Sequence, residues 1–199
     1  YGNGTFVIVG ESGTILTSDN GTTWVSRNSD QSFTEKGLSG VAYGNSTFVA
    51  VGNSGTILTS DNGTTWTSRD SSTNGTFEGV IYVNSIFMAV SGRTVFTSTD
   101  GTTWTDQTSL ASEMSTGFLR GITYANGSFV VVGSSGNILT SSDGTTWTSR
   151  TSGTTSHLRR VTYGNGTFVA VGYGNTILSS PGASGIVVNN AAGLLKLNG

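Results

Sequence analysis

Short apolar runs alternate with short polar segments along the whole chain, and no stretch repeats its apolar residues with a helical period. Phe6–Val9 is a continuous run of β-forming residues, which is typical of a strand covered on both faces. Thr14–Thr17 and Thr22–Ser26 alternate polar and apolar residues, as strands nearer a sheet edge do. Asn-Gly pairs such as Asn126-Gly127 supply the positive φ angles of tight hairpin turns. The pattern predicts an all-β protein.

The strand pattern belongs to a unit that recurs about every 40 residues. Its opening tyrosine stands at spacings of 42, 39, 42 and 39 residues, at Tyr1, Tyr43, Tyr82, Tyr124 and Tyr163. Four short strands in each unit, separated by turn signals, are typical of a propeller blade. We therefore predict one domain over residues 1–199, a five-bladed β-propeller of four-stranded antiparallel blades.

The turn before each tryptophan carries a family resemblance. Thr17–Trp24 and Thr59–Trp66 both contain T-S-D-N-G-T-T-W, which resembles the Asp box of sialidases, sortilin-type receptors, some xyloglucan-active glycosidases and the photosystem II assembly factor. In the third and fourth repeats the aspartate directly precedes the glycine. Aspartates in such turns accept backbone hydrogen bonds, and indoles fill gaps between sheets. We assign structural roles to Asp19, Asp61, Asp100, Asp143, Trp24, Trp66, Trp104 and Trp147.

The first and last repeats are each one strand short. Nothing precedes Tyr1 as an inner strand, and Ser180-Pro181-Gly182 replaces the last Asp box. We expect the tail, residues 183–199, to supply the two closing strands through Ile186–Val188 and Leu194–Leu197, because natural sheets seldom leave open edges. The alternative is that the tail pairs with a neighbouring molecule or with a further domain.

Composition excludes several classes of function. Charged residues make up 10% of the chain and the net charge is −2, which argues against nucleic acid and against an anionic membrane surface. No apolar run approaches the ~20 residues of a membrane helix, so no membrane insertion is expected. Cysteine is absent, and neither a metal-ligand cluster nor a phosphate-binding loop occurs, so we expect no metal and no cofactor.

Candidate binding residues lie on or beside the predicted inner strands. The loops between one blade and the next vary most among the repeats, and function concentrates on such loops. Nearby charges could form a small anion-attracting patch with one counter-charge, or could be solvated strand ends. These ligand-binding candidates are Arg120, Arg159, Arg160, Glu78 and His157.

Catalysis is not expected. A sialidase-type enzyme needs an arginine cluster, an activated nucleophile and a positioned carboxylic acid, and its family carries an Arg-Ile-Pro type signature. The sole proline here, Pro181, follows Ser180, so that signature is absent. We predict a non-catalytic binding module for glycans or a partner protein, secreted or displayed on a cell or virion surface. The alternative is a purely structural subunit of a virion, fibre or cell-surface layer, and a glycoside hydrolase is the least favoured.

Overall fold

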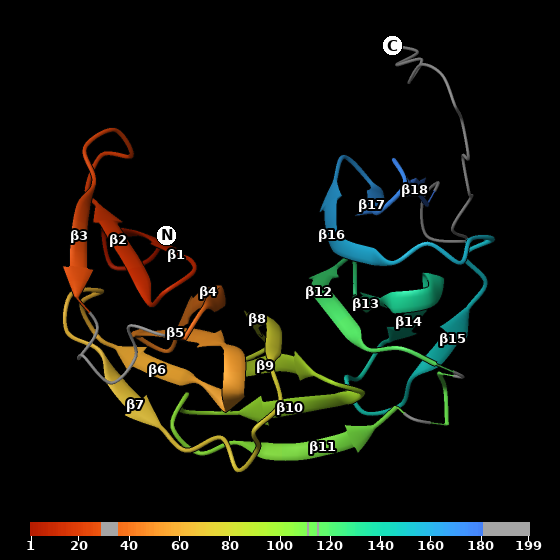
Figure 1. Ribbon diagram of the computed structural model, residues 1–199, viewed down its shortest axis with the longest axis horizontal. Coiled ribbons are helices and arrows are strands. Elements are labelled where there is room, and N and C mark those ends of the chain that lie inside the picture. Colours follow the sequence, from red (N-terminus) through yellow and green to blue (C-terminus); the bar gives the residue numbers. More distant parts are fainter. Residues whose placement is uncertain (29–35, 111, 115, 181–199) are drawn as a thin grey trace.

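The computed structural model describes residues 1–28, 36–110, 112–114 and 116–180, and these form five antiparallel sheets that follow one another around an open arc (Figure 1). The first sheet contains β1 (Phe6–Val9), β2 (Thr14–Ser18) and β3 (Val25–Asn28). The second contains β4 (Leu38–Gly44), β5 (Thr47–Gly52), β6 (Ile57–Ser60) and β7 (Thr67–Arg69). The third contains β8 (Phe77–Val83), β9 (Ile86–Ser91), β10 (Thr94–Ser98) and β11 (Thr105–Ser109). The fourth contains β12 (Leu119–Ala125), β13 (Ser128–Gly133), β14 (Ile138–Ser141) and β15 (Thr148–Arg150). The fifth contains β16 (Leu158–Gly164), β17 (Thr167–Gly172) and β18 (Ile177–Ser179).

Within each sheet the strands pair in chain order, so every sheet is a simple meander. The all-β prediction and the repeated antiparallel sheet are confirmed. Two short 3₁₀ turns, Asn53–Gly55 and Ser134–Gly136, join the second and third strands of the second and fourth sheets. Among the described residues no helix is long and apolar enough to cross a membrane.

The described part of the chain has three strands in the first and the last sheet and four in the others. The first sheet lacks an inner strand, the position that β4, β8, β12 and β16 hold near the middle of the arc (Figure 1). The fifth lacks an outer strand after β18. Closure of the ring by residues 183–199, through Ile186–Val188 and Leu194–Leu197, lies outside the described residues and stays a prediction.

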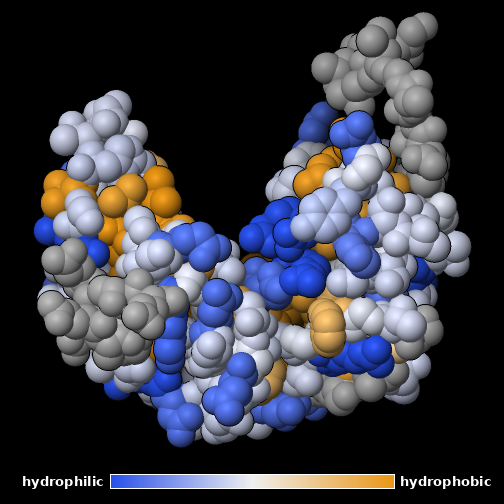
Figure 2. Space-filling model, viewed as in Figure 1, coloured by the Kyte–Doolittle hydropathy of each residue, from blue (hydrophilic) through white to orange (hydrophobic). Residues whose placement is uncertain are grey.

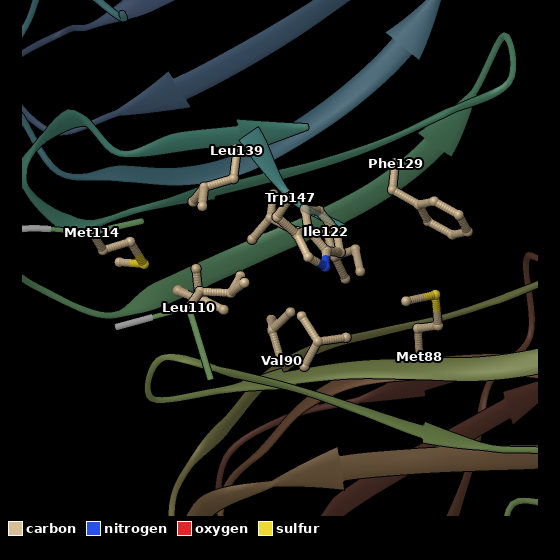
Figure 3. Packing of buried hydrophobic residues seen from close by; sticks show 11 residues of the cluster. Met88, Val90, Leu110, Met114, Ile122, Phe129, Leu139 and Trp147 are labelled. Atoms are coloured by element: carbon tan, nitrogen blue, oxygen red, sulfur yellow. The ribbon is translucent and has the colours of Figure 1, made fainter. Parts of the chain in front are cut away.

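The core is divided among the interfaces between successive sheets. We call the face of a sheet toward the next sheet its leading face, and the opposite one its trailing face. Between the third and fourth sheets, Met88 and Val90 on the leading face of β9 pack against Ile122, Phe129 and Trp147 (Figure 3). The other three interfaces have their own buried clusters of the same kind. Stability therefore depends on contacts between neighbours, as in other repeat proteins.

Three tryptophans fill such interfaces from the trailing face of their sheet. Trp66, Trp104 and Trp147 are 6–8% exposed, and each indole N–H donates to the carbonyl of the glycine three residues earlier, over 3.0–3.2 Å. Trp24 is only half-buried, because no described sheet covers the trailing face of the first sheet. Burial of the indole thus follows from the presence of a preceding sheet.

Between the fourth and fifth sheets no described residue takes the place that this indole has in the other interfaces. A small apolar pocket between the fourth and fifth sheets is bounded by Val132, Ile138, Val161 and Phe168, among others. Their counterparts one repeat earlier are residues of the cluster around Trp147. The chain has no tryptophan after Trp147, which explains the pocket.

The structure corrects the assignment of the turn-bracing residue in the first two repeats. There the acceptor is not Asp19 or Asp61 but the next residue, since Asn20 Oδ1 accepts from the N–H groups of Thr22 and Thr23 at 2.9 Å each, and Asn62 does the same in the second repeat. In the third and fourth repeats Asp100 and Asp143 occupy this position. The residue directly before the glycine is the one whose side chain can reach the N–H groups two and three residues ahead.

Replacing both Asp100 and Asp143 with asparagine is expected to reduce the acid sensitivity of the fold. The Thr102 hydroxyl and the Thr103 N–H hold the pKa of Asp100 well below its ordinary value, and the N–H groups of Thr146 and Thr145 do so for Asp143. A carboxyl whose pKa is lowered by folding stabilises the folded state above its unfolded pKa, and this stabilisation is lost as the pH falls below about 5. Asparagine keeps the acceptor and does not titrate.

Urea unfolding at pH 7 and at pH 3 tests this. The loss in free energy of unfolding between the two pH values should be smaller in the double variant than in the wild type. The reverse change, Asn20→Asp with Asn62→Asp, should enlarge it. Equal losses in all three proteins would contradict the linkage.

Candidate functional site

The inner strands carry four of the five predicted binding residues, and three of these form one row. Glu78 lies in β8, Arg120 in β12, and Arg159 and Arg160 in β16. Glu78, Arg120 and Arg159 hold the second position of successive inner strands, and these strands are neighbours. This position thus lines the inner wall of the arc, and in Figure 2 hydrophilic residues gather on the wall beside β12 and β16.

Two members of the row neutralise each other. Arg120 Nη1 donates to Glu78 Oε1 in a salt bridge between half-buried side chains. Glu78 therefore acts as the counter-charge of Arg120 and leaves little positive charge at that point. In the second sheet the same position is Ser39, whose hydroxyl donates to the Phe77 carbonyl.

The remaining two arginines have no carboxylate partner among the described residues. Arg160 Nη1 donates to the carbonyl oxygens of Arg120 and Arg159, at 3.2 and 3.0 Å. Arg159 Nη2 donates to the hydroxyl of Tyr173 over 2.5 Å, and its guanidinium carbon lies 4.8 Å from the centre of that ring. Neutral partners position both guanidinium groups without cancelling their charge, so this end of the row can attract an anion.

Sequence reasoning missed Tyr173, which lies in the turn between β17 and β18 and is 53% exposed. The predicted residue His157 stands beside it, with ring centres 6.0 Å apart. His157 Nδ1 accepts from the Ser135 N–H at 2.9 Å. The histidine thus connects the fourth and fifth sheets next to the arginine pair. The aromatic residue at the start of this turn, where the other repeats have Glu11, Asn53 and Ser134, was the available signal.

A separate polar pocket of about 330 Å³ lies between the second and third sheets. The connecting segment 71–75 and the turn 91–94 border it, and Phe96, Trp104 and Asp106 line its wall. The turn between β9 and β10 is Gly92-Arg93, shorter than the 3₁₀ turns of the second and fourth sheets. Between the third and fourth sheets the longer connection instead inserts Leu110 and Met114 into the core. A short turn and a short polar connection therefore create the pocket.

Arg93 and Asp106 are the charged residues of this pocket. Arg93 Nε donates to the Gly117 carbonyl at 2.9 Å, which holds the side chain toward the neighbouring connection. The sequence signal for Arg93 is the shortened S-G-R-T turn, which departs from the repeat. No group of three or more metal-ligating side chains occurs in the part of the chain that the structure describes.

Comparison with known proteins identifies the fold. No family model matches the sequence, and no curated protein matches it. Among solved structures, YCF48 from Cyanidioschyzon merolae aligns with a TM-score of 0.73 and 16% identity, over 94% of this chain and 67% of that one. YCF48 bound to D1 peptide aligns with a TM-score of 0.67 and 19% identity, over 87% and 59%. The nidogen/laminin complex aligns with a TM-score of 0.70 and 16% identity, over 89% and 74%.

These similar structures are β-propellers, so the predicted propeller fold is confirmed. At identities below 20% the likeness concerns the fold alone. The chain spans only 59% and 67% of the length of the two YCF48 structures. The five described sheets therefore align with only part of those propeller chains.

Proposed function

We propose that this chain is a non-catalytic binding module that holds an acidic segment of a partner protein against its inner strands. The observation that carries the proposal is the pair Arg159 and Arg160, which have no carboxylate partner among the described residues while Arg120 is paired with Glu78. Tyr173 adds an exposed aromatic surface beside them. Arginine with an aromatic neighbour is a combination enriched at protein interfaces.

The similar structures support a protein partner. One of them is described as bound to a D1 peptide, and another as a complex of nidogen with laminin. A propeller offers such partners a rigid wall on which residues from successive sheets are held in fixed order. A Thr-, Asn- and Gly-rich chain with few lysines suits a secreted or surface-displayed module, and we propose that location.

Titration with a fluorescein-labelled peptide of alternating glutamate and glycine tests the proposal by fluorescence anisotropy. Arg159→Ala with Arg160→Ala is expected to weaken binding by about tenfold or more, because each charge-assisted hydrogen bond contributes about 1.5–3 kcal/mol. Glu78→Gln should strengthen binding, since it leaves the charge of Arg120 unbalanced. Both effects should shrink as the salt concentration rises.

The matched control removes two arginines from outer strands. Arg69 and Arg150 each donate from Nε to a threonine hydroxyl of the adjacent strand at 2.8 Å, away from the inner row. Arg69→Ala with Arg150→Ala lowers the net charge by the same amount and should leave peptide affinity nearly unchanged. An equal loss of peptide affinity in both double variants would show that only the net charge matters, and would refute the site.

A glycan is the second candidate ligand, and the pocket between the second and third sheets favours it. Its volume of about 330 Å³ is in the range of small-molecule sites, and serine and threonine residues line it together with Arg93 and Asp106. Two results together would identify this pocket as the functional site instead. The inner-row variants would bind the acidic peptide normally, and a glycan array would detect a sugar whose binding is abolished by Asp106→Ala.

A further inference from the structure

The trailing face of the first sheet is built as an interface but has no partner in the described chain. Phe6 and Ile8 are 37% and 45% exposed, whereas their counterparts in the second sheet, Phe48 and Ala50, are 1% and 0% exposed. Figure 2 shows this end of the arc as a concentration of hydrophobic surface. Scattered surface apolar residues are ordinary, but an apolar face that neighbouring repeats bury indicates an interaction surface.

The aromatic side chains of this face already hold the arrangement of an occupied interface. The rings of Tyr1 and Phe6 are 4.5 Å apart at 51°, and those of Tyr43 and Phe48 are 4.5 Å apart at 52°. The Phe6–Trp24 separation is 6.5 Å, against 6.3 Å between Phe48 and Trp66. The face is therefore preorganised, so binding of a partner would not require these side chains to lose further conformational entropy.

At the other end of the arc, the leading face of the fifth sheet is exposed in the same way. Val171 and Ile177 are 41% and 49% exposed, whereas their counterparts in the fourth sheet, Val132 and Ile138, are 0% and 1% exposed. These counterparts pack against the trailing face of the fifth sheet. The described part of the chain thus has two unlike apolar faces, on its first and its fifth sheet, and each is one half of the interface that recurs between its sheets.

In two of the interfaces a glycine lies against the tyrosine of the next sheet, whereas the third and fourth sheets have Val83 and Ala125 at the glycine position. A Cβ at Gly2 or Gly44 would overlap the ring of Tyr43 or Tyr82 of the next sheet, at well under 3.0 Å. Gly164 holds the same position in the fifth sheet, yet nothing lies within 4 Å of its Cβ position. Tyr1, the tyrosine of the opposite face, is 73% exposed. The surface around Gly164 therefore has room for a tyrosine ring, and Tyr1 on the first sheet is an exposed tyrosine that could occupy it.

We propose that the leading face of the fifth sheet binds the trailing face of the first sheet of a second copy of this chain, with Tyr1 of one copy on Gly164 of the other. The described ends of a single chain lie far apart across the opening of the arc (Figure 1). The contact continues an interface that the chain already makes four times between its own sheets. It joins two different faces, so it is a head-to-tail contact that propagates from copy to copy. The inference does not depend on the peptide site.

The experiment measures mass by light scattering on a sizing column and by sedimentation over a concentration series. The wild type is expected to exceed the single-chain mass of 20.5 kDa as concentration rises.

Ile8→Asp damages only the first sheet's face and Val171→Asp only the fifth sheet's face. Each should weaken association by about 100-fold or more, because a charge would be buried without a partner. Gly164→Trp should also weaken association, because its side chain would fill the space beside residue 164 that the ring of Tyr1 is proposed to occupy. Ser149→Asp, an exposed change on β15, is the control and should associate like the wild type.

Mixing the two aspartate variants gives the decisive result. The Ile8→Asp chain keeps an intact fifth sheet and the Val171→Asp chain an intact first sheet, so together they should form a dimer of twice 20.5 kDa that grows no further. A wild type that stays at the single-chain mass at every concentration overturns the proposal, and a lowered melting temperature in Ile8→Asp would then indicate closure of the chain on itself. A mixture that remains monomeric overturns it equally.

Discussion

Trp104→Ala is expected to lower the free energy of unfolding by about 3–5 kcal/mol, a large part of the 5–15 kcal/mol typical of a folded domain. The indole is 8% exposed and packs between the second and third sheets with Val49, Phe77 and Phe87. Its N–H donates to the Gly101 carbonyl at 3.0 Å, so truncation leaves both a cavity and an unpaired buried carbonyl. Urea unfolding followed by circular dichroism measures the loss.

Trp24→Ala is the matched control, because this residue also follows a Gly-Thr-Thr turn segment but has no covering sheet in the described chain. Its cost should be less than half that of Trp104→Ala. If the two substitutions lower the free energy of unfolding equally, then either an indole packed between two sheets contributes little to stability or the first sheet is covered in solution. The wild-type oligomeric state distinguishes these explanations, since only the second requires a partner face.

The contrast between the two tryptophans shows how far a repeat sequence predicts its own structure. Strands, turns and the sheet period follow from residues that lie close together in the chain, so pattern and composition are sufficient to predict them. Burial of Trp24 depends on a covering sheet that no residue near it in the sequence supplies, so no local pattern carries that information. The Asn20 and Asn62 contacts were missed for a smaller reason: matching a motif by its aspartate placed the acceptor one residue too early.

The candidate site also contains residues that the repeat pattern predicts and residues that it does not. The row of Glu78, Arg120 and Arg159 could be predicted because equivalent positions of successive repeats must lie next to each other around the arc. Tyr173 and Arg93 were missed because both lie in turns that depart from the consensus: Tyr173 by residue type, and Arg93 by a shortened turn that also removes the register. Departures from the consensus are therefore the best places to look for function in a chain of near-identical blades.

Gly55→Ala is expected to destabilise the fold by about 2–5 kcal/mol. Gly55 ends the 3₁₀ turn Asn53–Gly55 with φ of +70°, a conformation that costs an L-residue about 1–2 kcal/mol. An added Cβ would also lie well inside 3.0 Å of the Thr73 carbonyl oxygen, so the segment leading to the third sheet must move. Overpacking of this kind costs about 1–3 kcal/mol more. The displacement would also strain the 2.8 Å hydrogen bond from the Gly55 N–H to the Gly75 carbonyl.

Gly127→Ala separates the two contributions, because Gly127 has a φ of +73° but nothing within 4 Å of its Cβ position. It should cost only the 1–2 kcal/mol of backbone strain. The difference between the two variants, measured by urea unfolding under identical conditions, isolates the contact between the turn and the connecting segment. This contact also fixes the segment that borders the polar pocket, so Gly55→Ala should change the accessibility of the pocket while Gly127→Ala leaves it intact. Equal destabilisation by the two substitutions would show that the segment yields freely and that the pocket has no rigid wall on that side.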